Sequence, residues 1–410
     1  MGVWRTFGLC WGVVLSFILL LCLLLPFGSG VFTRCVGFDH LSLYLSLLVV
    51  VLGLSAVLFN YSEVEAPSKM FLLCSLGFSV CCFVVNNSIV FWCFYELAML
   101  PLLFLVFQDS PYSERFVAGC YFSGYLLITS LPLLLILCYL SFINETCVIS
   151  CWSNYAASAW IYVVLALVFF TKVPLCPFHT WLPIVHAEAT SVVSTFLSGY
   201  IMKLGVVGVF RFTGGWFNGS FVFYILVCCV MAVGFLVSAS LELDGKRWLA
   251  LLSLSHIVVP VLGLFVCGWS LTPVVFLYSL GHGLSAGIVF GLLWLFYNNT
   301  NTRNWVLLKT GIGGKGVLVT VVMGLLSLCS FPTTIQFFME VSLVTTSSYL
   351  FMFLVFWFIY LFLGGLVPLV LCGHSILRVE AIESIEGGVY RFVPYLVVFI
   401  VWCYLGVCVF

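Results

Sequence analysis

The sequence predicts an all-α polytopic membrane protein with about 13 transmembrane helices, at roughly 20 apolar residues per span. Composition is the first reason. The 410-residue chain is 64% hydrophobic and only 7% charged, with a mean hydropathy of +1.27, whereas soluble domains are about 45–50% apolar and about 25% charged. The second reason is that its apolar runs are too long and too uniform for β-barrel strands, which alternate polar and apolar residues.

The expected spans end where Gly, Pro or polar residues interrupt the apolar runs. The first run has no small-residue cleavage site, so it is predicted to be a retained span rather than a signal peptide. Residues 372–390 are expected to form a solvated loop. The spans are placed, in chain order, at residues 8–27, 40–60, 68–86, 88–109, 115–141, 157–184, 189–211, 220–240, 247–267, 271–297, 312–346, 349–371 and 391–410.

The distribution of basic residues supports this order of spans. If the N-terminus and every second loop lie on one face, the opposite face carries only Arg34 and Arg211. This asymmetry satisfies the positive-inside rule, which places the N-terminus in the positive-inside compartment and the C-terminus opposite. The basic face carries Arg5, Lys69, Arg115, Lys246, Arg247, Arg303, Lys309, Lys315, Arg378 and Arg391.

Two expected spans contain residues that break helices. The sixth contains Pro174, Pro177 and Pro183, and the eleventh has a Gly-rich start and Pro332; proline removes a backbone donor and interrupts the helix. Five spans separate them, an odd number that inverts the topology, so they fit two inverted five-helix repeats. The alternative is two unrelated proline kinks. The corresponding divisions of the chain are residues 1–67, 68–211, 220–371 and 372–410.

Four formal charges lie inside expected spans: Glu96, Lys172, Lys203 and Glu340. A charge at the centre of a bilayer costs roughly 2.5–3.5 kcal/mol, so these side chains must face the protein interior, water or one another. The alternative is two inert ion pairs, but buried ion pairs stabilise a fold less well than apolar packing does. The four charges are therefore candidate functional residues.

Three histidines in apolar spans extend this group: His179, His256 and His282. A single membrane histidine is most often a packed hydrogen-bonding residue. Three of them beside two lysines and two glutamates fit a proton relay, because histidine titrates near neutral pH. Movement of Glu96 toward or away from Lys172 would switch that lysine between holding and releasing a proton, and the pair would titrate as one unit.

The sequence shows no cofactor or metal motif. Its 19 cysteines are scattered through apolar runs without the spacing of a zinc or iron–sulfur site, and we interpret them as small hydrophobic residues. No G-x-G-x-x-G follows an expected strand. The 14 basic and 14 acidic residues balance, which provides no basic face for nucleic acid. We therefore expect no cofactor in this chain and no nucleic-acid partner.

Several motifs, in order along the chain, resemble the antiporter-like subunits of respiratory complex I, NADH:ubiquinone oxidoreductase. The most specific is KVPLCPFHTWLPIVHAEAT, from Lys172 to Thr190, and MKLGVVGVFR, which ends at Arg211, is similar to the subunit 4 type. The resemblance extends from residue 90 or so to residue 345 or so. The other motifs are FYELAMLP around Glu96, the Asp244-x-Lys246 loop before SLSH at His256, HGLS at His282, and Phe331-Pro-x(7)-Glu340.

The resemblance implies a proton-translocating subunit of the membrane arm, driven by redox chemistry in other subunits. Glu96 and Lys172 would form a switching pair on the intake half-channel, and Glu340 would serve the exit half-channel. FMN, iron–sulfur clusters and ubiquinone would bind to partner subunits. The chain would contact other membrane-arm subunits, including antiporter-like neighbours, and membrane lipids. The stations on a central hydrated axis would be Lys203, His179, His256 and His282.

The chain also departs from that family. It has one expected span fewer, so a helix is expected to be missing near the N-terminus, and Thr190 stands where the family has proline. Residues 1–67 and 347–410 match weakly. The 41 phenylalanines and 19 cysteines fit a coding strand rich in T and G, as in a mitochondrial genome, or a simple exchange among apolar residues. We expect the mitochondrial inner membrane, with the N-terminus in the matrix and the C-terminus in the intermembrane space.

Three alternative functions remain open. A stand-alone Mrp-type cation/proton antiporter would use the same charges without a redox partner, and sister complex I subunits 2 and 5 would share the general motifs. A membrane acyltransferase using His179 or His282 is disfavoured, since no histidine has a carboxylate at H-x(4)-D spacing at a membrane face.

Overall fold

The computed structural model describes residues 30–59, 66–110, 112–152, 157–213, 221–267, 272–305, 314–377 and 389–408. In these residues the fold is a helical bundle with one two-stranded antiparallel sheet. The expected span at residues 8–27 lies outside the described residues, as do residues 378–388 of the expected loop. Residues 372–377, which are expected in this loop, lie instead in helix α16 (Phe351–Leu377).

The first helices agree with the expected spans to within a few residues. Asn87 fixes the start of α4, because its side chain accepts hydrogen bonds from the backbone N–H groups of Ile89 and Val90 at 3.1 and 3.3 Å. The elements of this part are β1 (Val31–Phe32), β2 (Gly37–Phe38), α2 (His40–Phe59), α3 (Ala66–Val84), α4 (Ser88–Gln108), α5 (Arg115–Ile143) and the 3-10 turn η1 (Ile149–Cys151).

The sixth expected span is broken, as its prolines predict. Helix α6 (Ala159–Lys172) ends before Pro174 and Pro177, and the chain becomes helical again in α7 (Trp181–Glu188). Pro183 does not interrupt α7, because it lies in the first turn, where its missing donor is not needed. The chain continues through α8 (Ser191–Phe196), the π-helical turn η2 (Leu197–Ile201) and α9 (Met202–Thr213).

The eleventh expected span is broken as well. Between α14 and α15, Ser330 and Thr333 have φ angles of 52° and 95°, in the strained left-handed region, and Thr334 caps α15 by accepting a hydrogen bond from the backbone of Phe337. The elements of this second part are α10 (Phe221–Leu241), α11 (Gly245–Val266), α12 (Thr272–Thr300), α14 (Gly314–Leu328), α15 (Ile335–Ser347), α16 (Phe351–Leu377), α17 (Val389–Leu405) and the 3-10 turn η5 (Gly406–Cys408).

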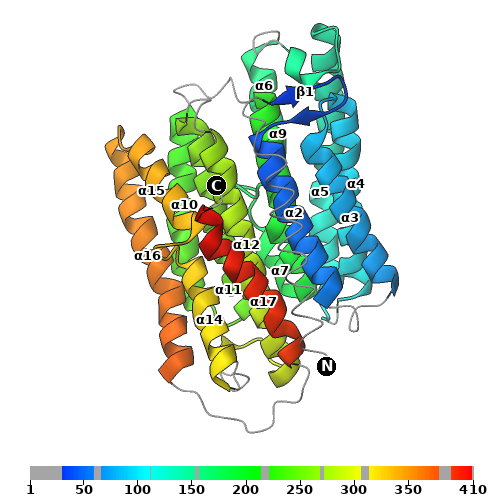
Figure 1. The fold of residues 1–410 in the computed structure, drawn as a ribbon. Coiled ribbons are helices and arrows are strands. Elements are labelled where there is room, and N and C mark those ends of the chain that lie inside the picture. The colour runs from blue at the N-terminus through cyan, green and yellow to red at the C-terminus, as the bar shows by residue number, and fades with distance from the viewer. Residues whose placement is uncertain are drawn as a thin grey trace.

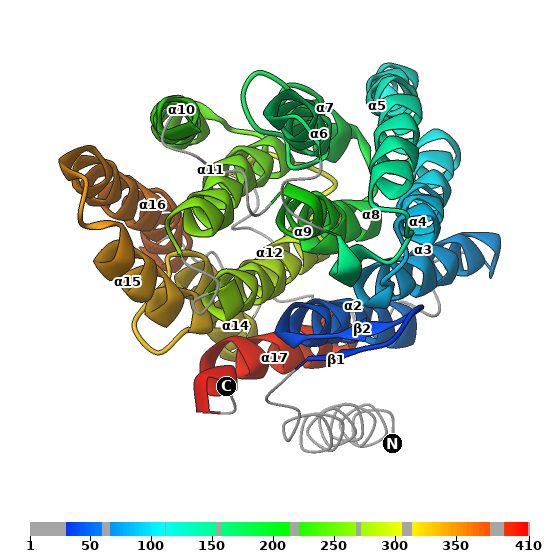
Figure 2. The ribbon, with the colours of Figure 1, turned by 90° about the horizontal axis from the view of Figure 1, so that it is seen from above.

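The helices differ strongly in how much of their surface is covered. They run roughly along one direction (Figure 1), and α9 and α12 lie near the centre when the bundle is seen from above (Figure 2). In an 18-residue apolar window of each segment, 94% is buried in Ser191–Thr213 and in Thr272–Asn298, against 28% in Arg115–Ile143 and 33% in Phe351–Ile376. The outer helices therefore expose apolar side chains, as lipid-facing helices do, while the two inner segments carry Lys203 and His282.

Among the described residues, eight helices are long and apolar enough to cross a membrane, and four shorter apolar helices accompany them. The backbone of these segments satisfies its own hydrogen bonds as helix, which is what a bilayer requires. The protein is thus an all-helical, multi-pass membrane protein, as the sequence predicts.

Basic residues occupy both ends of the bundle. Arg211 donates to the backbone carbonyl of Val85 at 2.6 Å, just before α4 begins. Lys246 and Arg303 lie instead over the ring of Tyr112, just after α4 ends. The sequence placed Arg211 on one face and the other two basic residues on the opposite face, and the structure puts them at opposite ends of α4.

Candidate functional site

The structure distributes the seven candidate residues across the width of the bundle. Seen from above, the helices that carry them lead from α4 on one side, through α9 and α12, to α15 on the other side (Figure 2). Five of the seven are almost completely buried: Lys172, Lys203, His256, His282 and Glu340 are at most 3% exposed. The prediction that the four charges avoid lipid is therefore confirmed for Lys172, Lys203 and Glu340.

Glu96 and Lys172 stand at one side of this row. Glu96 is half-buried on α4, and Lys172 is the last residue of α6. Each group interacts electrostatically with the other, yet among the described residues neither Glu96 Oε1 nor Lys172 Nζ has a hydrogen-bond partner. Three ion pairs are present in this part of the chain, and neither residue belongs to one. The two side chains are therefore in an open arrangement, in which they form neither a hydrogen bond nor an ion pair with each other.

Lys203 lies at the centre of the bundle and is completely buried. Its Nζ donates a hydrogen bond to the backbone carbonyl of Ser198, which belongs to the π-helical turn η2. A π-turn departs from the ordinary helical hydrogen-bond pattern. The lysine charge is therefore solvated by the backbone of its own segment rather than by a carboxylate.

His256 of α11 and His282 of α12 form a stacked pair next to Lys203. Their ring centroids are 5.2 Å apart with an angle of 11° between the planes, and the Lys203 charge acts on both rings. His256 Nδ1 lies 2.8 Å from the Leu252 carbonyl oxygen. Within the described residues, neither ring nitrogen of His282 has a hydrogen-bond partner.

Neutral polar side chains connect the histidine pair to the far side of the row. The Tyr360 ring packs edge-on against His256, with 5.8 Å between centroids, and its hydroxyl lies 3.3 Å from the Tyr278 hydroxyl. Gln336 Nε2 lies 3.5 Å from that hydroxyl and donates to Glu340 Oε1 at 3.1 Å. Together these groups form a nearly continuous polar path from His256 to Glu340.

Glu340 ends this path beside the break between α14 and α15. Its Oε1 also accepts a hydrogen bond from Ser330 Oγ at 2.9 Å, a residue of the broken segment. A small pocket of about 10 Å³ is lined in part by His256, Ser330, Glu340 and Tyr360. A space of that volume holds about one water molecule, and both His256 and Glu340 line it.

His179 does not join the other candidates. It lies between α6 and α7, and its ring packs against Phe235 of α10 with 4.9 Å between centroids. In the described part of the chain no hydrogen bond links it to the other six residues. The side-chain contact recorded for His179 is therefore with Phe235 rather than with another candidate residue.

The sequence-based analysis missed four polar residues of the site: Tyr278, Gln336, Tyr360 and His186. His186 of α7 is fully buried, stacks on Phe290 at 5.3 Å, and has two ring nitrogens without partners among the described residues. Its position inside an apolar span was the available signal. No comparable signal marks the other three, since neutral polar residues are common in helices that face a bundle interior.

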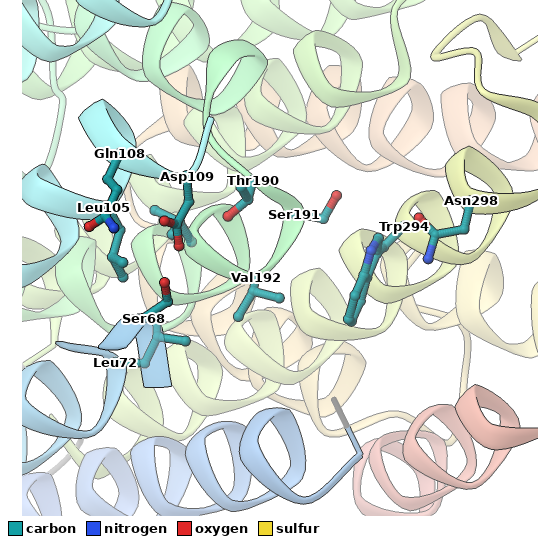
Figure 3. A pocket seen from close by; sticks show the side chains of 11 residues that line it. Ser68, Leu72, Leu105, Gln108, Asp109, Thr190, Ser191, Val192, Trp294 and Asn298 are labelled. Atoms are coloured by element: carbon teal, nitrogen blue, oxygen red, sulfur yellow. The ribbon is translucent and has the colours of Figure 1, made fainter. Parts of the chain in front are cut away.

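A large polar pocket opens where α4 and α12 end. It has a volume of about 640 Å³, and Figure 3 shows the Ser68 hydroxyl and the Asp109 carboxylate directed into the same part of it. A second, smaller pocket shares Ser191 with it and reaches Phe290, the residue on which His186 stacks. Water in these pockets would approach the buried row from this end of the bundle.

Nothing in the described residues offers a metal site. No group of three or more His, Cys, Asp or Glu side chains there is arranged to hold a metal ion. The ionisable groups of the row are carboxylates, amines and imidazoles, each of which exists in two protonation states.

Comparisons with known proteins cover this whole row. The sequence profile of the family described as NADH:quinone oxidoreductase/Mrp antiporter, TM, matches residues 85–366. The chain is 30% identical over 364 residues to NADH-ubiquinone oxidoreductase chain 4 of Ceratitis capitata, with 83% of this chain and 79% of that protein covered. It is 28% identical over 278 residues to the chain 4 protein of Rhipicephalus sanguineus, and the match spans 66% of this chain and 64% of that protein.

The fold is similar to that of a solved complex. A chain of the respiratory complex I from Thermus thermophilus with bound NADH superimposes with a TM-score of 0.81 at 21% sequence identity, with 98% of this chain and 91% of that chain covered. At this identity the likeness concerns the fold.

Proposed function

We propose a role in proton translocation for this chain, which belongs to the chain 4 group of the NADH:quinone oxidoreductase/Mrp antiporter transmembrane family. In this role it acts as a membrane-arm subunit of NADH:ubiquinone oxidoreductase. The observation that carries this proposal is the row of buried ionisable and hydrogen-bonding side chains between Glu96 and Glu340. An apolar bundle has no structural need for such a row, because apolar packing would stabilise it better.

The residue types in the row suit protons as the transported species. Lysine, glutamate and histidine each exist in two protonation states, so each is able to take up a proton and pass it on. Tyrosine hydroxyls and the Gln336 amide both donate and accept hydrogen bonds, or bridge water molecules that do. Buried ionisable residues in transmembrane segments commonly mark proton or ion pathways.

Each candidate has a proposed role. Glu96 and Lys172 form the switching pair on the intake side, since their open arrangement leaves the lysine free to change its protonation state. Glu340, beside the broken helix α14–α15, serves the exit side. The central stations are Lys203, His256 and His282, with His179 as a peripheral one.

Electron transfer takes place elsewhere in the proposed assembly. FMN, iron–sulfur clusters and ubiquinone belong to partner subunits, and the chain contacts antiporter-like neighbours and lipids in the mitochondrial inner membrane. The proposed arrangement has about 13 spans, with inverted repeats at residues 68–211 and 220–371. The N-terminus lies in the matrix and the C-terminus in the intermembrane space, in agreement with the distribution of basic residues.

Substitution of Lys203 tests the proposed function. Lys203→Ala removes the charge and the proton, whereas Lys203→Arg keeps a charge that does not release its proton. In the intact complex, reconstituted into vesicles with NADH and ubiquinone, we expect both variants to assemble and both to lower proton pumping. Restoration of pumping by arginine would show that only a fixed charge is needed, and normal pumping by both variants would refute the role of Lys203.

A Mrp-type cation/proton antiporter is the second candidate, because the matching family description covers both kinds of protein. Purification of the chain under mild conditions separates the two. A redox subunit copurifies with flavin and iron–sulfur clusters, whereas an antiporter does not.

A further inference from the structure

The C-terminal end of the short helix α7 is held by side chains from three distant segments. The last carbonyl groups of a helix have no partner within the helix and need other donors. Here three consecutive carbonyls each receive one. Arg303 Nη1 donates to Ala187 O at 2.6 Å, Ser110 Oγ donates to Glu188 O, and Lys246 Nζ donates to Ala189 O at 2.7 Å.

The two cations share one aromatic ring. Arg303 Cζ lies 4.2 Å, and Lys246 Nζ 4.9 Å, from the centroid of Tyr112. Burial raises the pKa of the Tyr112 phenol above its ordinary range, so the ring stays neutral and offers its face to the cations. Asp244 Oδ2 lies 3.4 Å from Arg303 Nε, and Glu188 Oε1 lies 4.0 Å from Nη1. Two acidic and two basic groups therefore balance.

Helix α7 has a particular need for such support. It is eight residues long, and isolated helices shorter than about 12–15 residues are marginal. Its N-terminal side follows the proline-rich break, so no continuous helix supports it on that side. It carries His186, whose carbonyl accepts a hydrogen bond from Ser194 Oγ at 3.3 Å, and the same segment continues through η2 to Lys203.

We propose that Tyr112, Arg303, Lys246 and Ser110 form a clamp that fixes the end of α7 and thereby sets the position of His186 relative to Lys203. We call this group the α7 clamp. Its members are positioning residues: they come from the loop after α4, the start of α11 and the segment after α12, so they join both halves of the chain at the broken helix. The claim about positioning rests on the proposed function, whereas the claim about the clamp does not.

A matched pair of substitutions at Tyr112 tests the clamp. Tyr112→Phe keeps the ring beneath both cations, whereas Tyr112→Leu removes it. Hydrogen–deuterium exchange of residues 181–196 is measured in the intact complex, where we expect the leucine variant to exchange about tenfold faster and the phenylalanine variant to stay near the parent. Equal exchange in the two variants would overturn the clamp.

Vesicles that contain the intact complex, as for the Lys203 variants, test whether the clamp positions His186. We expect Tyr112→Leu to oxidise NADH at nearly the parental rate while fewer protons move per electron, and Tyr112→Phe to keep the parental ratio. Faster exchange with a normal ratio would overturn the positioning role. If the leucine variant does not assemble, Ser110→Ala takes its place, because it removes one donor from the Glu188 carbonyl. Its hydrogen–deuterium exchange and its number of protons moved per electron are then compared with those of the parent.

Failure of this inference is distinct from failure of the proposed function. Normal pumping by the Lys203 variants would refute the proposed role of Lys203 in proton transfer and leave the exchange result to decide the clamp. Normal exchange in Tyr112→Leu would refute the clamp and leave the pathway intact.

Discussion

Replacement of Glu340 by glutamine removes a proton-carrying group while it preserves shape and hydrogen bonding. Glu340 is 2% exposed, and its Oε1 accepts hydrogen bonds from Ser330 Oγ at 2.9 Å and Gln336 Nε2 at 3.1 Å. The amide oxygen of glutamine accepts both bonds in the same place. Glu340→Gln therefore separates the ability to hold a proton from the ability to pack.

The energetic consequences of glutamine and alanine differ in a predictable way. Hydrogen bonds to a charged group contribute roughly 1.5–3 kcal/mol and those to a neutral group roughly 0.5–1.5 kcal/mol, but the neutral amide also avoids the cost of burying a charge. We expect the stability of Glu340→Gln to lie within about 1 kcal/mol of the parent. Glu340→Ala removes the acceptor of a buried donor, Gln336 Nε2, and of a half-buried donor, Ser330 Oγ. An unpaired buried donor costs about 1–3 kcal/mol, so this variant should be less stable than Glu340→Gln.

Vesicles that contain the purified complex allow both effects to be measured. Thermal dissociation reports stability, and NADH oxidation and the pH gradient are recorded together. Glu340→Gln should assemble at the parental level with a normal melting temperature and a strongly reduced number of protons per electron. A parental ratio in a fully assembled Glu340→Gln complex would refute the assignment of Glu340 to proton transfer.

Two further predictions concern the intake side and the packing of α9. Glu96→Gln removes the carboxylate that acts on Lys172, so NADH-driven pumping should fall while the complex still assembles; pumping at the parental ratio would contradict the switching role. Gly208→Ala places a Cβ within 2.2 Å of the buried Phe169 ring, so it should cost about 1–3 kcal/mol by overpacking and lower the melting temperature. Gly77→Ala, where nothing lies within 4 Å of the new Cβ, is its control and should leave the melting temperature unchanged or slightly higher.

The spans could be predicted from the sequence because a bilayer fixes the length of an apolar helix. The expected span at residues 88–109 corresponds to Ser88–Gln108 in the structure. The effect of each proline could not be predicted as well. Pro101 and Pro260 lie inside continuous helices, whereas the chain breaks around Pro174 and Pro332. Neighbouring helices and side chains satisfy the freed backbone groups in the first case, and sequence alone does not show which neighbours are present.

The charged part of the site could be predicted for a related reason. Lys203 and Glu340 stand out in the sequence because a charge in an apolar span is costly wherever it points. Tyr278 and Gln336 do not stand out, because a neutral polar side chain is tolerated in many positions. Only the packing of α12 against α15 brings the Tyr278 hydroxyl and the Gln336 amide to within 3.5 Å of each other, and this contact is a property of the fold rather than of either segment.

The change from charged to neutral groups along the row has a physical reason. A formal charge at every station would multiply the cost of burial, and like charges would repel one another at short range. Between His256 and Glu340 the polar groups are instead two hydroxyls and an amide, which donate and accept hydrogen bonds without a formal charge. Their spacings of 3.3 and 3.5 Å are long for hydrogen bonds. In the proposed pathway, proton transfer through this neutral stretch would therefore require the groups to move closer or water to occupy the pocket beside Tyr360, and a small movement of α15, next to its break, would be enough to change these spacings.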